Sequence, residues 1–401
     1  MSKIAVIVSN PCISDGRVLK MIYAAAEAGY DVNVFATLGN NSRPFEIIEG
    51  VKFHRFQWKP LEILRKYWFF SLLSKLNKKL TTKLMKPLVP FIKYNLFEKV
   101  FIDAIIEINP NLIHAHDLIC LPTGYAAAAK CDAKLVYDAH ELELHRNPPL
   151  PILQKMMVGH IERKYGRKAN SVITVGRLVG QELAKHLKRD DINIIYNSPV
   201  ILSSPSNIRS DLRLNKSDLL LIYVGKVTEG RGVTDIVNLL PSLPNIFFAT
   251  IGPYDNHAKS RIESRARSLG VSSRFRILPP VPSDEVVSYI KGANLGLISV
   301  EPITLSYQYC MPNKLFELAF AEIPILSNTL DEIEIFLKQF GNGTITDFTN
   351  KTSLPYIIYK HLYNYANYLP STEKKELLYK IYSWDTQKVK LLNIYQKLDV
   401  N

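Results

Sequence analysis

The chain has 401 residues, a formal net charge of +13 and a hydrophobic fraction of 47%. This length is enough for two domains with separate cores, and the composition excludes an intrinsically disordered chain. No apolar run approaches the ~20 residues that span a bilayer. The four cysteines are scattered, without the spacing of a disulfide framework or a metal site, so we expect a cytoplasmic protein.

Short apolar runs alternate with helical patterns over the first half of the chain. The predicted strands lie at 4–8, 32–36, 112–115, 134–138 and 171–175, and the predicted helices at 16–29, 96–108, 122–131 and 150–168. Strands buried on both faces and separated by helices are typical of a parallel sheet covered by helices. The first run is too short for a signal peptide and is interpreted as a buried strand.

Most of the positive charge lies between Lys59 and Lys99. This segment holds ten Lys and Arg against two Glu, a net +8 of the total +13. Leucines and lysines recur there in two parallel rows after a run of aromatic residues: Leu72, Leu76, Leu80 and Leu84; Lys75, Lys79 and Lys83; Tyr67, Trp68, Phe69 and Phe70. Such a basic amphipathic helix is suited to an anionic surface, here the inner face of the cytoplasmic membrane. The alternative is a helix whose leucines pack on the domain core. No nucleic-acid recognition motif accompanies the charge, so no nucleic acid is expected.

The same alternation restarts in the second half of the chain. Its predicted strands lie at 219–224, 246–251, 274–278, 295–299 and 323–327, after a polar, proline-containing linker at 197–215. The sequence therefore predicts an α/β protein with two facing, doubly wound domains. Ligands of such folds bind at the carboxyl ends of the strands, so we expect a cleft between the domains there.

Histidines and carboxylates follow two predicted strands of the first half. His114, His116 and Asp117 stand at the end of one strand, and Asp138, His140 and Glu141 stand at the end of the next. Histidines at strand ends can hydrogen-bond a substrate hydroxyl or phosphate, with a neighbouring carboxylate fixing the tautomer. The alternatives are histidines satisfied by backbone carbonyls, or a metal site, which the spacing supports only weakly.

Glycines and basic residues follow the first two strands of the second half. Gly225, Lys226 and Arg231 come after the first strand, and Gly252 and Pro253 after the second. Glycines let the backbone approach a ligand closely, and fixed positive charge suits a pyrophosphate. The alternative is a tight turn with solvated basic residues.

A Pro-x-Lys-x-x-Glu segment, Pro312 to Glu317, opens a predicted helix just before the strand at 323–327. The N-terminus of a helix carries about half a positive charge and suits an anionic ligand such as a diphosphate, while the carboxylate can hold ribose hydroxyls. The alternative is a capped helix with a surface Lys–Glu pair. A glycine fingerprint of the dinucleotide-binding type is missing from the turn after the first strand, Ser9 to Arg17.

Together these features resemble the family 4 retaining glycosyltransferases, which have the GT-B fold. The similarity runs from the first strand to Tyr382-Ser383-Trp384-Asp385 and the last helix. The phosphate-binding Arg and Lys of that family correspond to Lys226 and Arg231, with the identities exchanged. Its Glu-x7-Glu motif places the ribose-binding glutamate on Glu317 and the first glutamate on Tyr309, which is a departure from the family pattern.

The resemblance implies two Rossmann-like domains. An N-terminal acceptor-binding domain would cover residues 1–197 and a nucleotide-sugar-binding domain 198–383, with a terminal helix of about 384–401 packing back on the first domain. The active-site histidine of the family corresponds to His116. Glu322 stands where the family usually has glycine.

The implied site residues fall into three groups. We assign His116, Lys226, Arg231 and Glu317 to catalysis; Gly225, Gly252, Pro253, Tyr309, Asn313, Lys314 and Glu317 to donor binding; and Asp15, Gly16, Arg17, His140 and Glu141 to the acceptor side.

The resemblance implies transfer of a sugar, with retention of configuration, from a UDP- or GDP-sugar to a glycan or lipid-linked glycan, as in capsule, O-antigen or lipopolysaccharide assembly. Lys226, Arg231 and a helix N-terminus would stabilise the leaving diphosphate, so neither a metal nor another cofactor is expected. A nucleotide-sugar epimerase and a non-catalytic nucleotide-sugar-binding subunit remain as alternatives. An NAD-dependent oxidoreductase lacks its glycine fingerprint.

Overall fold

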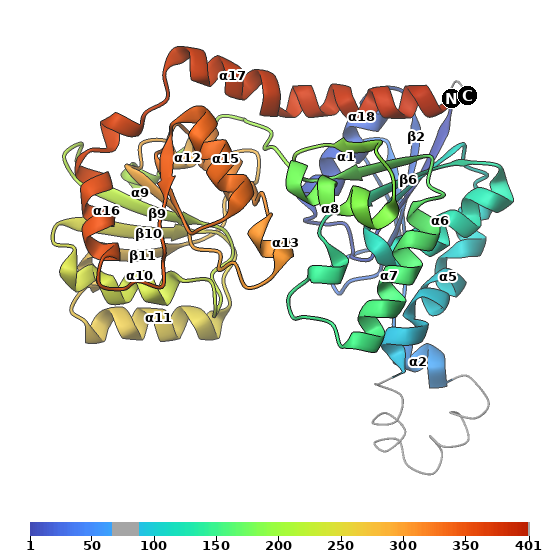
Figure 1. Cartoon of the computed structure of the whole chain (residues 1–401), viewed down its shortest axis with the longest axis horizontal. Helices are drawn as coiled ribbons and strands as arrows, with labels where there is room; N and C mark the ends of the chain where they lie inside the picture. The colour runs from blue at the N-terminus through green and yellow to red at the C-terminus, as the bar shows by residue number, and fades with distance from the viewer. Residues whose placement is uncertain (66–87, 400–401) are drawn as a thin grey trace, which may run out of the picture. The chain divides into compact units, whose positions relative to one another are not determined.

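The computed structural model describes residues 1–65 and 88–399, which form two compact units (Figure 1). Unit 1 contains Met1–Ile195 and the chain from Lys388 onward, and unit 2 contains Tyr196–Gln387. The sequence placed these divisions after residue 197 and at about residue 384. The leucine and lysine rows of the basic segment lie outside the described residues. Within the described part of the chain, no helix is long and apolar enough to cross a membrane.

Unit 1 is built on an eight-stranded sheet with the order β3-β4-β2-β1-β5-β6-β7-β8. The strands are β1 (Lys3–Ile7), β2 (Asp31–Thr37), β3 (Phe45–Ile48), β4 (Val51–Phe56), β5 (Leu112–His116), β6 (Lys134–Ala139), β7 (Ser171–Thr174) and β8 (Ile192–Ile194). All neighbours pair in parallel except β3 and β4. The chain order reverses between β1 and β5, so the carboxyl ends of these central strands offer the usual ligand position of a doubly wound sheet.

Helices cover this sheet. They are α1 (Gly16–Glu27), α2 (Pro60–Arg65), α5 (Val89–Glu107), α6 (Asp117–Cys131), the 3₁₀ turn η1 (Glu143–His145), α7 (Ile152–Gly166), α8 (Arg177–Leu187) and the end of α18 (Trp384–Asp399). Large buried side chains such as Phe97, Phe101 and Tyr137 fill the core. The helix predicted over 122–131 is confirmed, but its predicted start is wrong. Helix α6 begins at Asp117, directly after the last residue of β5.

Unit 2 contains a six-stranded parallel sheet with the order β11-β10-β9-β12-β13-β14. The strands are β9 (Leu219–Val224), β10 (Ile246–Ile251), β11 (Phe275–Leu278), β12 (Leu295–Ile298), β13 (Ile325–Ser327) and β14 (Gly343–Ile345). The helices are α9 (Ile208–Asp211), α10 (Val233–Leu239), η2 (Leu240–Ser242), α11 (Asn256–Ser268), η3 (Ser272–Arg274), α12 (Val286–Ile290), α13 (Leu305–Gln308), α14 (Asn313–Phe320), α15 (Asp331–Phe340), α16 (Leu354–Tyr363), η4 (Tyr365–Tyr368) and α17 (Thr372–Tyr382).

The predicted linker at 197–215 is only partly irregular. Its second half contains α9, which Asn207 caps through its side chain. Ile208 is fully buried in the core of unit 2, and Leu212 and Leu214 pack against the same core. Because three apolar side chains anchor it, this segment is an integral part of unit 2.

Candidate functional site

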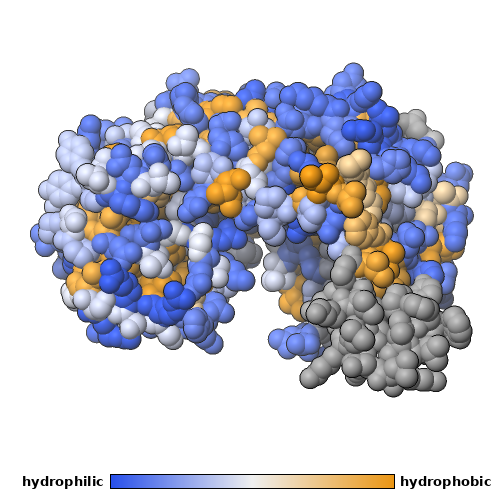
Figure 2. Space-filling model, turned by 60° about the horizontal axis from the view of Figure 1, so that its bottom comes forward, coloured by the Kyte–Doolittle hydropathy of each residue, from blue (hydrophilic) through white to orange (hydrophobic). Residues whose placement is uncertain are grey.

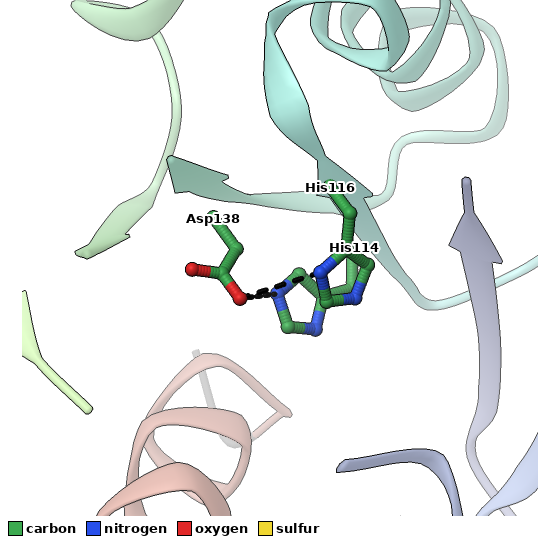
Figure 3. Close-up of side chains that lie close together, drawn as sticks. All are labelled: His114, His116 and Asp138. Atoms are coloured by element: carbon green, nitrogen blue, oxygen red, sulfur yellow. Dashed lines mark ion pairs between the residues drawn. The ribbon is translucent and has the colours of Figure 1, made fainter. Parts of the chain in front are cut away.

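A buried polar cluster occupies the carboxyl end of the unit 1 sheet, with Asp138 at its centre (Figure 3). Arg17 donates from Nε and Nη2 to the two carboxylate oxygens of Asp138, at 2.9 and 2.8 Å. His116 Nδ1 and His140 Nε2 lie 3.3 and 3.4 Å from Oδ2 of the same carboxylate. The predicted acceptor-side residues Arg17 and His140 and the predicted catalytic His116 therefore meet on one carboxylate.

Strand geometry explains this meeting. His116 and Asp138 are register partners in the parallel pair β5–β6. Side chains two residues apart point to the same face of a strand, so His114 lies beside His116, with the rings stacked at 4.1 Å between centroids. Nδ1 of His114 is hydrogen-bonded to Tyr395 Oη of α18, at 2.7 Å.

The first residues of α1 and α6, which lie next to the cluster, have distinctive local conformations. Asp15 caps α1 by accepting from the amide of Val18 and from the side chain of Asn10, which orients the helix that carries Arg17. Gly16 is the first residue of α1, and a Cβ there would meet nothing within 4 Å. At the start of α6, Asp117 has a φ of +63°, a strained conformation of the kind that accumulates at functional sites.

Burial and charge set the protonation of the cluster. Burial alone would raise the pKa of Asp138, but the Arg17 charge and the two histidines hold that pKa well below its usual range. Burial lowers the pKa of His116, despite its hydrogen bond with Asp138. Burial would also lower the pKa of His140, but Asp117 and Asp138 raise it above the ordinary value.

The neutral His116 is therefore held by an ionised carboxylate. With Nδ1–H facing Asp138, Nε2 carries the lone pair, and this buried atom has no hydrogen-bond partner in the described part of the chain. A neutral imidazole of this kind can accept a proton from a hydroxyl or hydrogen-bond a sugar.

Ligand atoms of His114, His116 and Asp138 lie within 4.8 Å of one another, close enough to hold a metal ion. Both oxygens of Asp138 are already bound to the Arg17 guanidinium, however, and a divalent cation would stand next to that positive charge. The donor set fits an arginine–carboxylate–histidine network better than a metal site.

A second polar cluster lies at the carboxyl ends of β9 and β10 in unit 2. Gly225 and Gly252 end the two strands with φ of +123° and +140°. A Cβ on Gly252 would lie 2.5 Å from the carbonyl oxygen of Gly225, so only glycine fits there. A Cβ on Gly225 would lie 3.3 Å from its nearest neighbour, Nζ of Lys314.

Lys314 is the unusual member of this cluster. It lies in the first turn of α14 and is 9% exposed, with Nζ 3.7 Å from the centroid of the Tyr223 ring. Among the described residues its ammonium has neither a hydrogen bond nor an ion pair. Burial lowers the pKa of Lys314 to about 7, with Glu317 opposing and Arg231 adding to the shift.

The other predicted donor residues line the same strand ends or lie on the surface. Lys226 and Arg231 are exposed in the glycine-rich loop after β9, and Glu317 is half-buried on α14. Pro253 is exposed and Tyr309 is half-buried at the end of α13. Asn313 is exposed and accepts a hydrogen bond from Asn197.

On the acceptor side, Glu141 is half-buried and burial raises the pKa of its carboxyl group. Five residues of the clusters were not among the assigned site residues: His114, Asp117, Asp138, Tyr395 and Tyr223. The first three belong to the strand-end motifs of the sequence. Asp138 had a usable signal, because it ends a buried strand two residues before His140. Tyr395 and Tyr223 had none in the local sequence.

Solved structures of glycosyltransferases share this architecture. Sucrose-phosphate synthase from Thermosynechococcus elongatus aligns over 100% of both chains with a TM-score of 0.74 and 16% identity. Anabaena HepE, solved in complex with UDP and glucose, aligns over 99% of this chain and 100% of its own, with a TM-score of 0.68 and 13% identity. The two parallel-sheet units therefore have the GT-B fold, which confirms the predicted fold class.

Residues 17–198 match the family described as Glycosyltransferase Family 4. Alpha-galactosylglucosyldiacylglycerol synthase of Streptococcus pneumoniae is 24% identical over 198 residues, 45% of this chain and 49% of its own. TuaC of Bacillus subtilis, named as a teichuronic acid biosynthesis glycosyltransferase, is 25% identical over 231 residues, 55% of this chain and 53% of its own. The chain thus spans about half the length of these relatives. The match to residues 17–198, together with the GT-B fold, supports the predicted resemblance to the family 4 glycosyltransferases.

Proposed function

We propose that the protein transfers a sugar from a UDP- or GDP-sugar, with retention of configuration, to a glycan or lipid-linked glycan of the bacterial cell surface. The family and fold support the transfer. A relative named for glycolipid synthesis and another named for teichuronic acid biosynthesis support the class of acceptor. HepE, which has the same fold, is described in complex with UDP-glucose.

The observation that carries the donor side is the buried ammonium of Lys314. A buried ammonium is costly even with the Tyr223 ring and the Glu317 carboxylate nearby, and this cost falls when an anion binds beside it. A Cβ on Gly225 would lie 3.3 Å from Nζ, so the glycine leaves space beside the ammonium, and Arg231 adds positive charge nearby. A nucleotide diphosphate at these strand ends would supply the missing negative charge, with Glu317 available to hold ribose hydroxyls.

On the acceptor side, the Nε2 lone pair of neutral His116 accepts a hydrogen bond from a sugar or acceptor hydroxyl. Asp138 keeps that ring in one tautomer, and Arg17 keeps Asp138 ionised. Lys314, Arg231 and Lys226 stabilise the charge that develops on the leaving diphosphate. Because three cations serve this role, we propose that the transfer requires no metal.

A thermal-shift screen without added metal tests the donor assignment. Its ligands are UDP, GDP, CMP, ADP, NAD and a panel of UDP- and GDP-sugars. A nucleotide at 100 times its Kd adds about 2.7 kcal/mol to the free energy of unfolding, so a selective rise in Tm with UDP or GDP is expected. Glu317→Ala should reduce the shift, whereas Glu334→Ala, a half-exposed carboxylate of α15 paired with Lys338, should not. The absence of a shift with every nucleotide diphosphate would contradict the proposal.

A further inference from the structure

Helix α7 presents exposed apolar side chains on the outside of unit 1. Ile152, Leu153 and Met156 are 78%, 71% and 69% exposed, and all three lie in its first turns. Figure 1 shows α7 on the surface of the unit, and Figure 2 shows hydrophobic atoms exposed on this half of the molecule. Single exposed apolar residues are common, but three on adjoining positions of one helix mark an interaction surface.

Basic side chains follow these apolar residues along the exposed side of α7. At 100° per residue, Ile152, Met156 and Arg163 share one face, and Leu153 and Lys164 lie beside it. From Ile152 to Lys168 the exposed charged residues are all basic: Lys155, Arg163, Lys164, Arg167 and Lys168. The single carboxylate in that stretch is Glu162, which is buried. The exposed face of α7 is thus apolar at its start and basic beyond it.

The chain that enters α7 is suited to an apolar environment. Three of the residues just before the helix are prolines, Pro148, Pro149 and Pro151, and all three are exposed. Proline has no backbone N–H, so this turn loses fewer hydrogen bonds to water when it leaves the aqueous phase.

The helix is also anchored to the polar cluster of unit 1. Tyr137 Oη donates to Oε1 of the buried Glu162 at 2.8 Å, and Tyr137 precedes Asp138 in β6. An occupant bound to the exposed face of α7 is therefore held at a fixed position relative to His140 and Asp138.

We infer that the exposed face of α7, from Ile152 to Lys164, docks on an anionic lipid bilayer, with its apolar first turns inserted at the interface and its basic residues facing the headgroups. Charge complementarity and the proline-rich entry favour lipid over an acidic protein surface. The inference deepens the proposed function and rests on it for the acceptor, because a lipid-linked glycan is presented at such a surface.

Co-sedimentation with vesicles tests the inference. The full chain is incubated with vesicles of phosphatidylcholine alone, or of equal parts phosphatidylcholine and phosphatidylglycerol, without donor or acceptor. The unchanged protein should sediment with the mixed vesicles and much less with phosphatidylcholine. The triple variant Ile152→Ser, Leu153→Ser, Met156→Ser should bind the mixed vesicles about 100-fold more weakly, because each of these side chains contributes about tenfold or less when partly inserted.

Two further variants sharpen the test. Lys155→Gln with Lys164→Gln should weaken binding to the mixed vesicles by about 30-fold, at about fivefold per basic group. The control triple Ile47→Ser, Tyr356→Ser, Leu369→Ser removes side chains that are 60%, 69% and 47% exposed elsewhere on the surface, and it should bind like the unchanged protein.

Equal sedimentation of the α7 triple variant and the unchanged protein would overturn the inference, as would failure of the unchanged protein to bind the mixed vesicles. A change of mass from dimer to monomer in the α7 triple variant would assign the surface to a second copy of the chain instead of lipid. Thermal shifts with UDP and GDP, measured on the same preparations, separate this outcome from failure of the donor assignment, because nucleotide binding needs no vesicle.

Discussion

The affinity for a nucleotide sugar should fall as pH rises through neutrality. The reason is that Lys314, the cation proposed to contact the diphosphate, loses its proton in this range. Burial lowers the pKa of Lys314 to about 7 in the free protein. A diphosphate next to Nζ favours the charged form and moves this pKa back toward the ordinary value for lysine. Binding therefore takes up a proton above neutral pH, and it is tightest below the pKa of the free protein.

The size of the effect follows from the protonated fraction. One negative charge at ~4 Å is worth about 4 kcal/mol at an effective dielectric constant of about 20, equal to about 3 pH units, so Lys314 stays charged in the complex up to high pH. In the free protein the charged fraction falls from about nine-tenths at pH ~6 to about 3% at pH ~8.5. The apparent Kd should rise about 30-fold over this range, or about 2 kcal/mol.

Isothermal titration calorimetry with an intact nucleotide sugar is the suitable assay. Each of its two phosphates has one ester bond and the shared anhydride bond, so both keep a single constant charge in this range, unlike the terminal phosphate of a free diphosphate. Lys314→Met keeps the length of the side chain and should bind weakly with no pH dependence. Lys338→Met, at an exposed lysine of α15, should behave like the unchanged protein. A flat pH profile for the unchanged protein would refute the role of Lys314.

Three substitutions test the packing around the two clusters. Gly252→Ala should lower the free energy of unfolding in urea by about 3 kcal/mol or more, since its Cβ would meet the Gly225 carbonyl at 2.5 Å; normal stability would contradict that geometry. Tyr395→Phe should lower the free energy of unfolding by about 1–3 kcal/mol, because it leaves Nδ1 of His114 without its hydrogen bond. A decrease below about 0.5 kcal/mol would show that this hydrogen bond is weak. Glu322→Gly should change the free energy of unfolding by less than about 1 kcal/mol, because it relieves a φ of +61° but loses partly exposed ion pairs with Lys375 and Lys291; a loss above about 1 kcal/mol would mean that the ion pairs outweigh the strain.

The long parallel strands could be predicted from the sequence because they are buried on both faces and appear as continuous apolar runs. The hairpin of β3 and β4 was missed for the opposite reason. Phe45 and Ile47 are 52% and 60% exposed at the sheet edge, and β4 alternates buried and half-buried residues. Strand β14 has three residues and begins at Gly343, so its apolar pattern is too short to recognise.

The predicted site residues depended on one rule, that polar residues after parallel strands gather at one edge of the sheet. This rule brought His116 and His140 together, 3.1 Å apart between ring nitrogens. It could not reveal which group orders them, because the Arg17–Asp138 pair joins residues 121 positions apart. The burial of Lys314 was equally hidden, since a lysine in a first helical turn is usually solvated.

The two clusters differ in a way that bears on how each works. In unit 1 the carboxylates of Asp138 and Asp117 face Arg17 and His140, so the orientation of His116 is set before any substrate arrives. In unit 2, among the described residues, only Glu317 and Cys310 oppose the effect of burial on the pKa of Lys314, and an anion bound beside Nζ would favour the charged form further. For the proposed transfer from a nucleotide sugar, we therefore expect a preoriented hydrogen-bond acceptor at His116 and a cation at Lys314 whose protonation responds to the diphosphate.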